Sequence, residues 1–259
     1  NVARPAAIIG VASLAVASLA AWVVVRAPHL TSGVAAVETE AGVSRALATD
    51  RSARISNLRY SLSLDIPSAA SQPVSGRLEI TFDLHDASRP LAFDFAQPPD
   101  HLRALTAGGR RTTPRIDRGH FILSPAQLSE GRNAIAVEFV AGNESLNRHD
   151  DYLYSLFVPS RASVAIPVFD QPDLKARWRV SMILPRDWQA LSNGREVGRV
   201  VVGDRAHVVF DQTPPIPPYL LALVAGRFSV ETAEREGRTF RMFHRESDAA
   251  KVARNRDAI

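Results

Sequence analysis

The tightest cluster of imidazole and carboxylate side chains in the sequence is His149-Asp150-Asp151. Such groups could bind a hard cation or orient a catalytic base, but adjacent side chains diverge, so a site would need further ligands from elsewhere. No two of the 7 histidines have the i, i+4 spacing that places two imidazoles on one helical face for zinc. A solvated loop over residues 142–151 is the simpler interpretation.

Other common catalytic and cofactor motifs are absent from the sequence. The chain contains 0 cysteines, which excludes disulfides, thiolate zinc sites and a cysteine nucleophile. It also lacks the G-x-S-x-G turn of serine hydrolases, the G-x-x-x-x-G-K-[ST] phosphate loop and the G-x-G-x-x-G dinucleotide turn. The sequence therefore predicts no catalytic residue, no metal ligand and no cofactor-binding residue within this chain.

Composition indicates a folded protein without a nucleic-acid partner. The 259 residues are 46% hydrophobic and 22% charged, which is typical of a chain with a substantial core. The net charge is only +4, and most of the basic residues are arginines scattered singly along the chain. Because binding to nucleic acid requires clustered cations that neutralise several phosphates at once, we expect no nucleic-acid binding.

The amino-terminal region resembles an export signal. An uncharged apolar run over residues 5–25 is flanked by Arg4 and Arg26, and it is long enough to cross a bilayer as a helix. Val34-Ala35-Ala36 resembles a signal-peptidase site. A cleaved signal peptide and a permanent signal anchor both fit, and a buried globular helix is a third alternative. We expect periplasmic or extracellular export, or anchoring in the inner or plasma membrane through residues 5–25.

Hydrophobic periodicity predicts one short helix followed by many strands. Residues 38–55 carry Val43, Leu47 and Ile55 near helical spacing, which indicates an amphipathic helix. The period then changes to two, and apolar residues alternate with polar ones from Leu58 to Ile66. The same alternation predicts eight further strands, at residues 77–84, 90–95, 120–123, 133–140, 177–184, 196–202, 207–210 and 219–228.

These patterns predict an all-β fold of antiparallel saddle-like or sandwich sheets. Parallel strands would need crossover helices, and the sequence shows none between the predicted strands. A hydrophobic helix precedes the sheets, and a short helical start at residues 247–259 follows them, with Ser247 as its expected N-cap.

The most distinctive stretch of the chain is residues 151–178. Pro167 and Pro172 hold the residues before them extended, and the Asp170 carboxylate can accept backbone N–H bonds in a turn. We expect a rigid, aromatic-lined surface loop. A purely structural corner between two sheets is the alternative.

Part of this stretch resembles a known family. Residues 166–177 (IPVFDQPDLKAR) resemble the F-P-C-F-D-E-P-x-x-K-A segment of the aminopeptidase N and leukotriene hydrolase group of gluzincin zinc metallopeptidases. Residues 55–60 are similar to the start of that family's domain. Further on, Ser192-Asn193-Gly194, Thr213-Pro214 and residues 219–228 resemble its S-N-G, T-x-P and Y-L-x-A-x-x-x-G-x-F motifs in order.

The resemblance implies a division into three parts. Residues 1–37 would be the leader and linker, residues 38–237 the family's amino-terminal saddle-like β domain, and residues 238–259 a linker with the first turns of the catalytic domain. In this family the β domain packs beside a thermolysin-like catalytic domain and helps to close the substrate cleft.

The resemblance places the peptide chemistry outside these residues. The family's G-x-M-E-N and His-Glu-x-x-His motifs, which bind zinc and activate water, do not occur in this sequence. The parent enzyme would therefore bind zinc and remove N-terminal residues from peptides through its catalytic domain. This chain would bind no zinc, would be inactive alone, and would have a cleft-forming role.

One family feature is replaced in this sequence. Many members have Gln-x-Glu just before the proline-rich segment, and its carboxylate holds the substrate's α-amine, but Leu156, Phe157 and Val158 occupy those positions. No substrate-binding carboxylate is therefore carried over. The substrate-cleft candidates are Leu156, Val158, Arg161 and Asp170.

Two alternatives to the aminopeptidase interpretation stay open. The first is a stand-alone exported β-sandwich without catalysis, which binds a peptide or protein through residues 158–178. It would require an exposed sheet edge or an exposed aromatic patch. The second is an enzyme that acts through His149, Asp150 and Asp151.

Overall fold

The computed structural model describes residues 40–256 of the chain. The predicted apolar helix at residues 5–25 and the predicted cleavage site at residues 34–36 lie outside this range. The described residues belong to one compact unit. Within the described range, no helix has both the length and the apolar character needed to cross a membrane.

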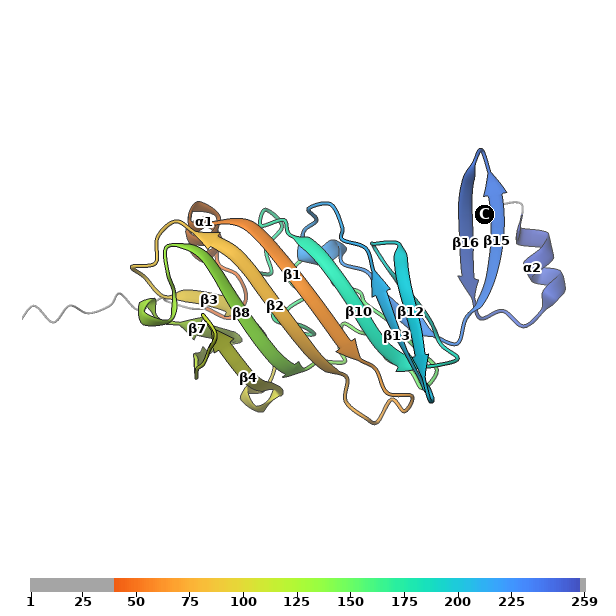
Figure 1. Cartoon of the computed structure of the whole chain (residues 1–259), viewed down its shortest axis with the longest axis horizontal. Helices are drawn as coiled ribbons and strands as arrows, with labels where there is room; N and C mark the ends of the chain where they lie inside the picture. The colour runs from red at the N-terminus through yellow and green to blue at the C-terminus, as the bar shows by residue number, and fades with distance from the viewer. Residues whose placement is uncertain (1–39, 257–259) are drawn as a thin grey trace, which may run out of the picture. The chain divides into compact units, whose positions relative to one another are not determined.

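The described residues are mostly strand, which confirms the predicted all-β class. The largest element is an eight-stranded sheet, in the order β12-β13-β10-β1-β2-β8-β4-β5, and Figure 1 shows most of it face on. Its strands are β12 (Glu196–Val202), β13 (Arg205–Phe210), β10 (Arg177–Pro185), β1 (Ile55–Asp65), β2 (Ser75–Leu84), β8 (Gly131–Val140), β4 (Leu102–Ala107) and β5 (Arg110–Arg111).

Three smaller sheets and two α-helices complete the fold. One three-stranded sheet has the order β11-β14-β9, another has the order β3-β7-β6, and β15 and β16 form a hairpin. The strands of the first sheet are β11 (Gln189–Ser192), β14 (Leu223–Gly226) and β9 (Tyr152–Tyr154). Those of the second are β3 (Leu91–Asp94), β7 (His120–Leu123) and β6 (Arg115–Asp117). The hairpin consists of β15 (Ser229–Arg235) and β16 (Arg238–His244). The helices are α1 (Arg45–Arg54) and α2 (Ala249–Arg256), with short 3₁₀ turns η1 (Pro99–His101), η2 (Pro125–Gln127) and η3 (Pro218–Leu220).

The predicted alternation corresponds to one buried face of the large sheet. In β1 the side chains of Tyr60, Leu62 and Leu64 are buried, while the residues between them are exposed or half-buried. Two three-stranded sheets contribute to the same hydrophobic core, since it contains residues of β3, β7, β9 and β14. Alternation along a strand is what a sheet with one covered face requires.

One strand pair contradicts the prediction of purely antiparallel sheets. Strands β1 and β10 are parallel neighbours, in register from Arg59 opposite Arg177 to Asp65 opposite Ile183. The crossover between them consists of β2 to β9 and the proline-rich corner, and contains no α-helix. Because other strands connect this parallel pair, the sequence contains no crossover helix that would have indicated it.

The predicted amphipathic helix is shorter than expected and buries charge. Helix α1 begins after Ser44, whose hydroxyl accepts the Leu47 N–H at 3.2 Å, and it ends before Ile55, which opens β1. Leu47 is buried as predicted, but Arg51 and Arg54 are buried beside it. A hydrophobic pattern cannot identify a buried arginine.

The carboxy-terminal elements also differ from the prediction. The strand expected over residues 219–228 is the 3₁₀ turn η3 followed by β14, and residues 238–244, expected in a linker, form β16. The predicted N-cap at Ser247 is wrong by one residue, because the Asp248 carboxylate accepts the N–H groups of Ala250 (2.9 Å) and Lys251 (3.2 Å). The domain boundary at residue 237 stays a prediction.

Tyr60 connects the parallel strand pair to the proline-rich corner. Its ring stacks on that of Trp178 with a centroid distance of 4.1 Å, and its hydroxyl accepts the backbone N–H of Phe169 at 2.9 Å. The side chain is 1% exposed. Since water cannot reach the Phe169 N–H, the hydroxyl is needed to satisfy it.

Replacing Tyr60 with Phe should lower the free energy of unfolding by about 1–3 kcal/mol, because a buried N–H loses its acceptor while the packing is kept. The loss is measured by urea unfolding. Tyr154→Phe is the matched control, since Tyr154 is 40% exposed, and it should change stability very little. Equal effects of the two substitutions would contradict this role of Tyr60.

Candidate functional site

The proline-rich segment is a buried corner of the fold. Ile166, Val168 and Phe169 are inaccessible to solvent, and Asp170 and Gln171 are 3% exposed. The prediction of a surface loop over residues 151–178 is therefore wrong for residues 165–171, where the alternative of a structural corner matches the structure. Val168 forms an antiparallel bridge with Asp94 at the end of β3, and the chain then enters β10.

The Asp94 carboxylate is the centre of this corner. Its Oδ1 accepts Arg51 Nη2 at 2.6 Å and lies 2.7 Å from Nδ1 of His120. Its Oδ2 accepts Arg51 Nη1 at 2.8 Å and the backbone N–H of Asp170 at 2.7 Å. One carboxylate thus joins helix α1, strand β7 and the corner.

The charges of this cluster determine each other's protonation. Burial alone would raise the pKa of Asp94, but the Arg51 guanidinium and the surrounding hydrogen bonds outweigh it and lower the pKa. Burial would lower the pKa of His120, but the hydrogen bond and charge of Asp94 outweigh it and raise the pKa. The arrangement favours an ionised Asp94 that holds a guanidinium and an imidazole.

Gln171 attaches helix α1 to the same corner. Its side-chain Nε2 donates to the carbonyl of Ala48 at 3.1 Å, to the Ser52 hydroxyl at 3.1 Å and to Asp173 Oδ1 at 3.0 Å. The Ser52 hydroxyl also contacts the Asp173 carboxylate. The residues of the D-Q-P-D sequence therefore serve to fix a helix to the sheet.

An extended segment over residues 152–158 presents a row of apolar side chains to solvent. Tyr154, Leu156 and Val158 are 40%, 54% and 49% exposed, and Tyr152 is half-buried. The residues between them point inward, since Leu153 and Phe157 are buried. We call Tyr152, Tyr154, Leu156 and Val158 the apolar strip.

Hydrogen bonds occupy both edges of the segment that carries the apolar strip. On one side Tyr154 pairs with β14, and the Ser155 N–H donates to the Leu223 carbonyl at 2.8 Å. On the other side the N–H groups of Tyr154 and Leu156 donate to the carbonyls of Leu146 and Ser145. The segment offers side chains to a partner but no free strand edge at these positions.

The structure groups three of the four cleft candidates and separates the fourth. Leu156 and Val158 belong to the apolar strip, and Arg161 follows it, with its guanidinium 2.9 Å from the exposed carboxylate of Glu144. Asp170 is buried beneath this loop, where its Oδ2 accepts the Ser163 N–H at 2.9 Å. Whether any of the four contacts a substrate stays a prediction.

The other motif residues hold the chain next to the apolar strip. Asn193 holds the end of the η3 turn. Its side chain donates to the Leu220 carbonyl at 2.9 Å and accepts the Ala222 N–H at 2.7 Å. Gly194 leaves no room for a side chain, because a Cβ would lie 2.0 Å from the Asp211 carbonyl oxygen. Thr213 accepts the Trp178 N–H through its hydroxyl at 3.0 Å.

The cluster at residues 149–151 is engaged in structural contacts. The His149 ring stacks on Tyr152 at 4.4 Å between centroids, and the Asp151 carboxylate lies 2.6 Å from Arg245 Nη2. The Arg245 guanidinium also lies over the Tyr152 ring, at 4.2 Å. In the described part of the chain, no group of three or more His, Cys, Asp or Glu residues is arranged to hold a metal ion.

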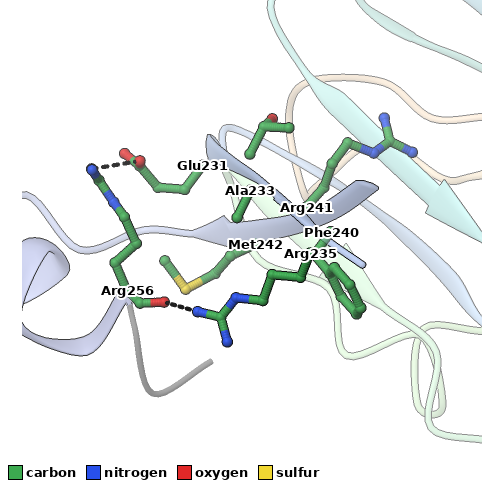
Figure 2. A pocket seen from close by; sticks show the side chains of 8 residues that line it. Glu231, Ala233, Arg235, Phe240, Arg241, Met242 and Arg256 are labelled. Carbon is green, nitrogen blue, oxygen red and sulfur yellow. Dashed lines mark hydrogen bonds and ion pairs between the residues drawn. The ribbon is translucent and has the colours of Figure 1, made fainter. Parts of the chain in front are cut away.

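A small cavity that the sequence did not indicate lies at the hairpin formed by β15 and β16. Figure 2 shows it beside β15 and β16, with Ala233, Phe240 and Met242 among its apolar lining. Arg256 of α2 closes one side, with its guanidinium 2.8 Å from Glu231 Oε2 and its carbonyl 3.4 Å from Arg235 Nη2. These contacts show that the cavity is where α2 packs on the hairpin.

Residues 142–220 match the family model described as the peptidase M1 N-terminal domain. Curated relatives include the probable M1 family aminopeptidase 1 of Encephalitozoon cuniculi, 28% identical over 132 residues, and aminopeptidase N of Haemonchus contortus, 36% identical over 90 residues. These alignments cover 47% and 34% of this chain but only 15% and 9% of the relatives. The chain therefore spans a small part of their length.

Solved structures agree with this match at the level of the fold. The M1 zinc metallopeptidase of Deinococcus radiodurans superposes with a TM-score of 0.60 at 18% sequence identity, over 73% of this chain and 46% of that one. The matched family region contains the apolar strip, the buried corner, Asn193 and Thr213. The family resemblance predicted from the sequence is confirmed.

The His120–Asp94 contact predicts a pH-dependent contribution to stability. Because the folded state raises the pKa of His120 above its unfolded value of about 6.5, the contact stabilises most below that value and loses its effect as the pH rises through the folded pKa. The free energy of unfolding of the wild type should therefore exceed that of His120→Gln by more at pH 5.5 than at pH 9.

The measurement is urea unfolding across this pH range. His207→Gln provides the control, because His207 is exposed. A stability difference for His120→Gln that does not change with pH would show that folding does not raise the pKa of His120, and a difference that falls at low pH would show that the imidazole is kept uncharged in the folded protein.

Proposed function

Because the chain carries the N-terminal β domain of the M1 aminopeptidase family, we propose that it forms one wall of the substrate cleft in a zinc aminopeptidase that removes N-terminal residues from peptides. The family match over residues 142–220 carries this proposal. The two curated relatives described above are named as aminopeptidases, and the chain covers 15% and 9% of them. The activity would belong to the larger enzyme.

The apolar strip is the surface best suited to this role. Three of its four side chains are exposed, and the segment that carries them is held by backbone hydrogen bonds to neighbouring strands and loops. A rigid apolar surface of this kind is typical of a contact with another domain or with the side chains of a peptide. Leu156 and Val158 would form its central part.

The side chains of Leu156 and Val158 carry no group that could bind a peptide's α-ammonium. Where the family that the sequence resembles has a glutamate, this chain presents the exposed Leu156 and Val158. A hydrocarbon side chain offers no hydrogen-bond acceptor. In the proposed enzyme the α-ammonium at this subsite would be held by the catalytic domain alone.

Zinc would bind outside the described residues. The solved relative is a zinc metallopeptidase, but the imidazole and carboxylate groups of residues 40–256 form no cluster of three, and the buried Asp94 and His120 are bound to each other. The residues present do not fit a zinc site, so no hydrolytic step is assigned to them. Their contribution would be positioning and shape.

The proposed enzyme is exported or membrane-anchored. This part of the proposal is supported by the uncharged run at residues 5–25 and by the possible cleavage site Val34-Ala35-Ala36. Cleavage after Ala36 would release the enzyme from the leader, whereas an uncleaved leader would keep it attached to the membrane.

Peptide mass spectrometry of the native protein, isolated from membrane and periplasmic fractions, tests both parts. We expect peptides that continue beyond Ile259 and include a His-Glu-x-x-His sequence, together with either an intact leader or a first residue at Val37. A native protein that ends at Ile259 would contradict the aminopeptidase assignment. Recovery from the cytoplasm alone would contradict export.

Dye binding tests the apolar strip in the chain from residue 34 to residue 259. Replacing Leu156 and Val158 together with Ser should lower the fluorescence of an apolar-surface dye at least twofold and reduce aggregation, because the substitution removes the centre of an exposed apolar row.

The double substitution of Val200 and Val202 with Ser is the matched control. These side chains lie on β12 and are 62% and 74% exposed, so they are at least as accessible as the strip residues. An equal loss of dye signal in both variants would contradict the proposal that the strip is the main apolar binding surface of the domain. A monodisperse wild-type protein that binds no dye would favour the stand-alone β-sandwich.

A further inference from the structure

A second pocket, with a volume of about 370 Å³, opens beside Asp170. Its walls come from five parts of the chain: the segment before α1, the end of β3 with the loop after it, the turn that leads into β7, the loop that follows the apolar strip, and the proline-rich corner with Asp170. Polar groups that line it include Asp170, His120, Ser160 and Ser163.

Asp170 is a buried carboxylate that lacks a cationic partner. Its residue is 3% exposed, and Oδ2 accepts the Ser163 N–H at 2.9 Å. No basic side chain within residues 40–256 lies within ion-pair distance of it, whereas the neighbouring Asp94 is neutralised by Arg51. Burial, and then the charge of Asp94, raises the pKa of Asp170. A cation in the pocket would relieve both effects.

The shape and lining of the pocket suit an ammonium group better than a divalent metal ion. A primary ammonium has three N–H donors, which can be shared between a carboxylate oxygen, a serine hydroxyl and water. A divalent ion requires more carboxylate ligands than Asp170 supplies here, and the described residues contain no group of three such ligands. Arg118 lines the same pocket and lies 4.0 Å from Asp117.

We propose that this pocket binds a primary ammonium group, with the Asp170 carboxylate as its counter-ion and the Ser163 hydroxyl as an acceptor. The group could come from an external amine or from the chain's own amino terminus. Cleavage after Ala36 would create a new terminus three residues before Glu40, whose carbonyl lies 2.9 Å from His120 Nε2 in the pocket wall. Three extended residues span about 10 Å, which is enough to reach the pocket.

This proposal is independent of the aminopeptidase assignment, because it uses only contacts within the β domain. It also differs from the predicted role of Asp170 as a residue that lines a substrate cleft. The pocket is lined by Ser160 and Ser163, which follow the apolar strip, and by none of the residues of the strip itself.

Thermal unfolding of residues 34–259 in the presence of simple amines tests the site. Methylammonium should raise the melting temperature by several degrees at saturation, because a ligand that binds only the folded state stabilises it. Tetramethylammonium at the same ionic strength has the same charge but no N–H donor, and it should have no effect.

Asp170→Asn should abolish the response to methylammonium, which corresponds to an affinity loss of at least tenfold, while the amide oxygen can still accept the Ser163 N–H. Asp204→Asn, at an exposed carboxylate, should respond like the wild type. Should Asp170→Asn fail to fold, Ser163→Ala supplies a second test, with a several-fold weaker response expected from the loss of one acceptor.

The two sources of the ammonium group are separated by the chain that begins at Val37, prepared with a free or an acetylated terminus. If the chain's own terminus binds, the free form should melt at a higher temperature and ignore methylammonium, while the acetylated form responds. Equal responses in both forms would assign the site to external amines. A melting temperature that changes equally with both cations, or a response that survives in Asp170→Asn, would overturn the proposal.

Discussion

The Asp94 carboxylate is the interaction on which the rest of the β domain depends. Its two oxygens lie within 2.8 Å of four nitrogen atoms, from Arg51 of α1, His120 of β7 and the backbone of Asp170. A buried charge without these partners would cost several kcal/mol, and among the described residues the side chains of Arg51 and His120 form ion pairs with Asp94 alone. The folded arrangement of three elements is therefore coupled through a single side chain.

This coupling explains how a surface without regular structure can be rigid. The corner is anchored at Asp94 and at Tyr60, and the loop over residues 155–163 is in turn held by Asp170 and by hydrogen bonds to β14 and to residues 145–146. The apolar strip is thus presented by a loop whose inner side chains are fixed. Pre-organised loops on a rigid sheet are the usual location of binding surfaces.

Sequence periodicity predicted strands with one covered face, such as β1, and it also predicted the bounds of β7 and β12. Periodicity could not predict which side chains face solvent where apolar residues follow one another without polar residues between them. The apolar strip was partly missed because Leu153 and Phe157 alternate with other apolar residues, so the period of two has no polar phase. Arg51 was missed because its burial depends on Asp94, which is 43 residues away.

The motif residues that make hydrogen bonds within the domain differ from the exposed residues in what they can predict. Asn193, Thr213 and Gln171 each satisfy particular backbone or side-chain groups, so the fold itself requires them and they identify it. Leu156 and Val158 point to solvent and satisfy nothing within the domain, so the fold leaves their identity open. A resemblance built on the first group therefore predicts the architecture, whereas the second group can change without cost to the fold.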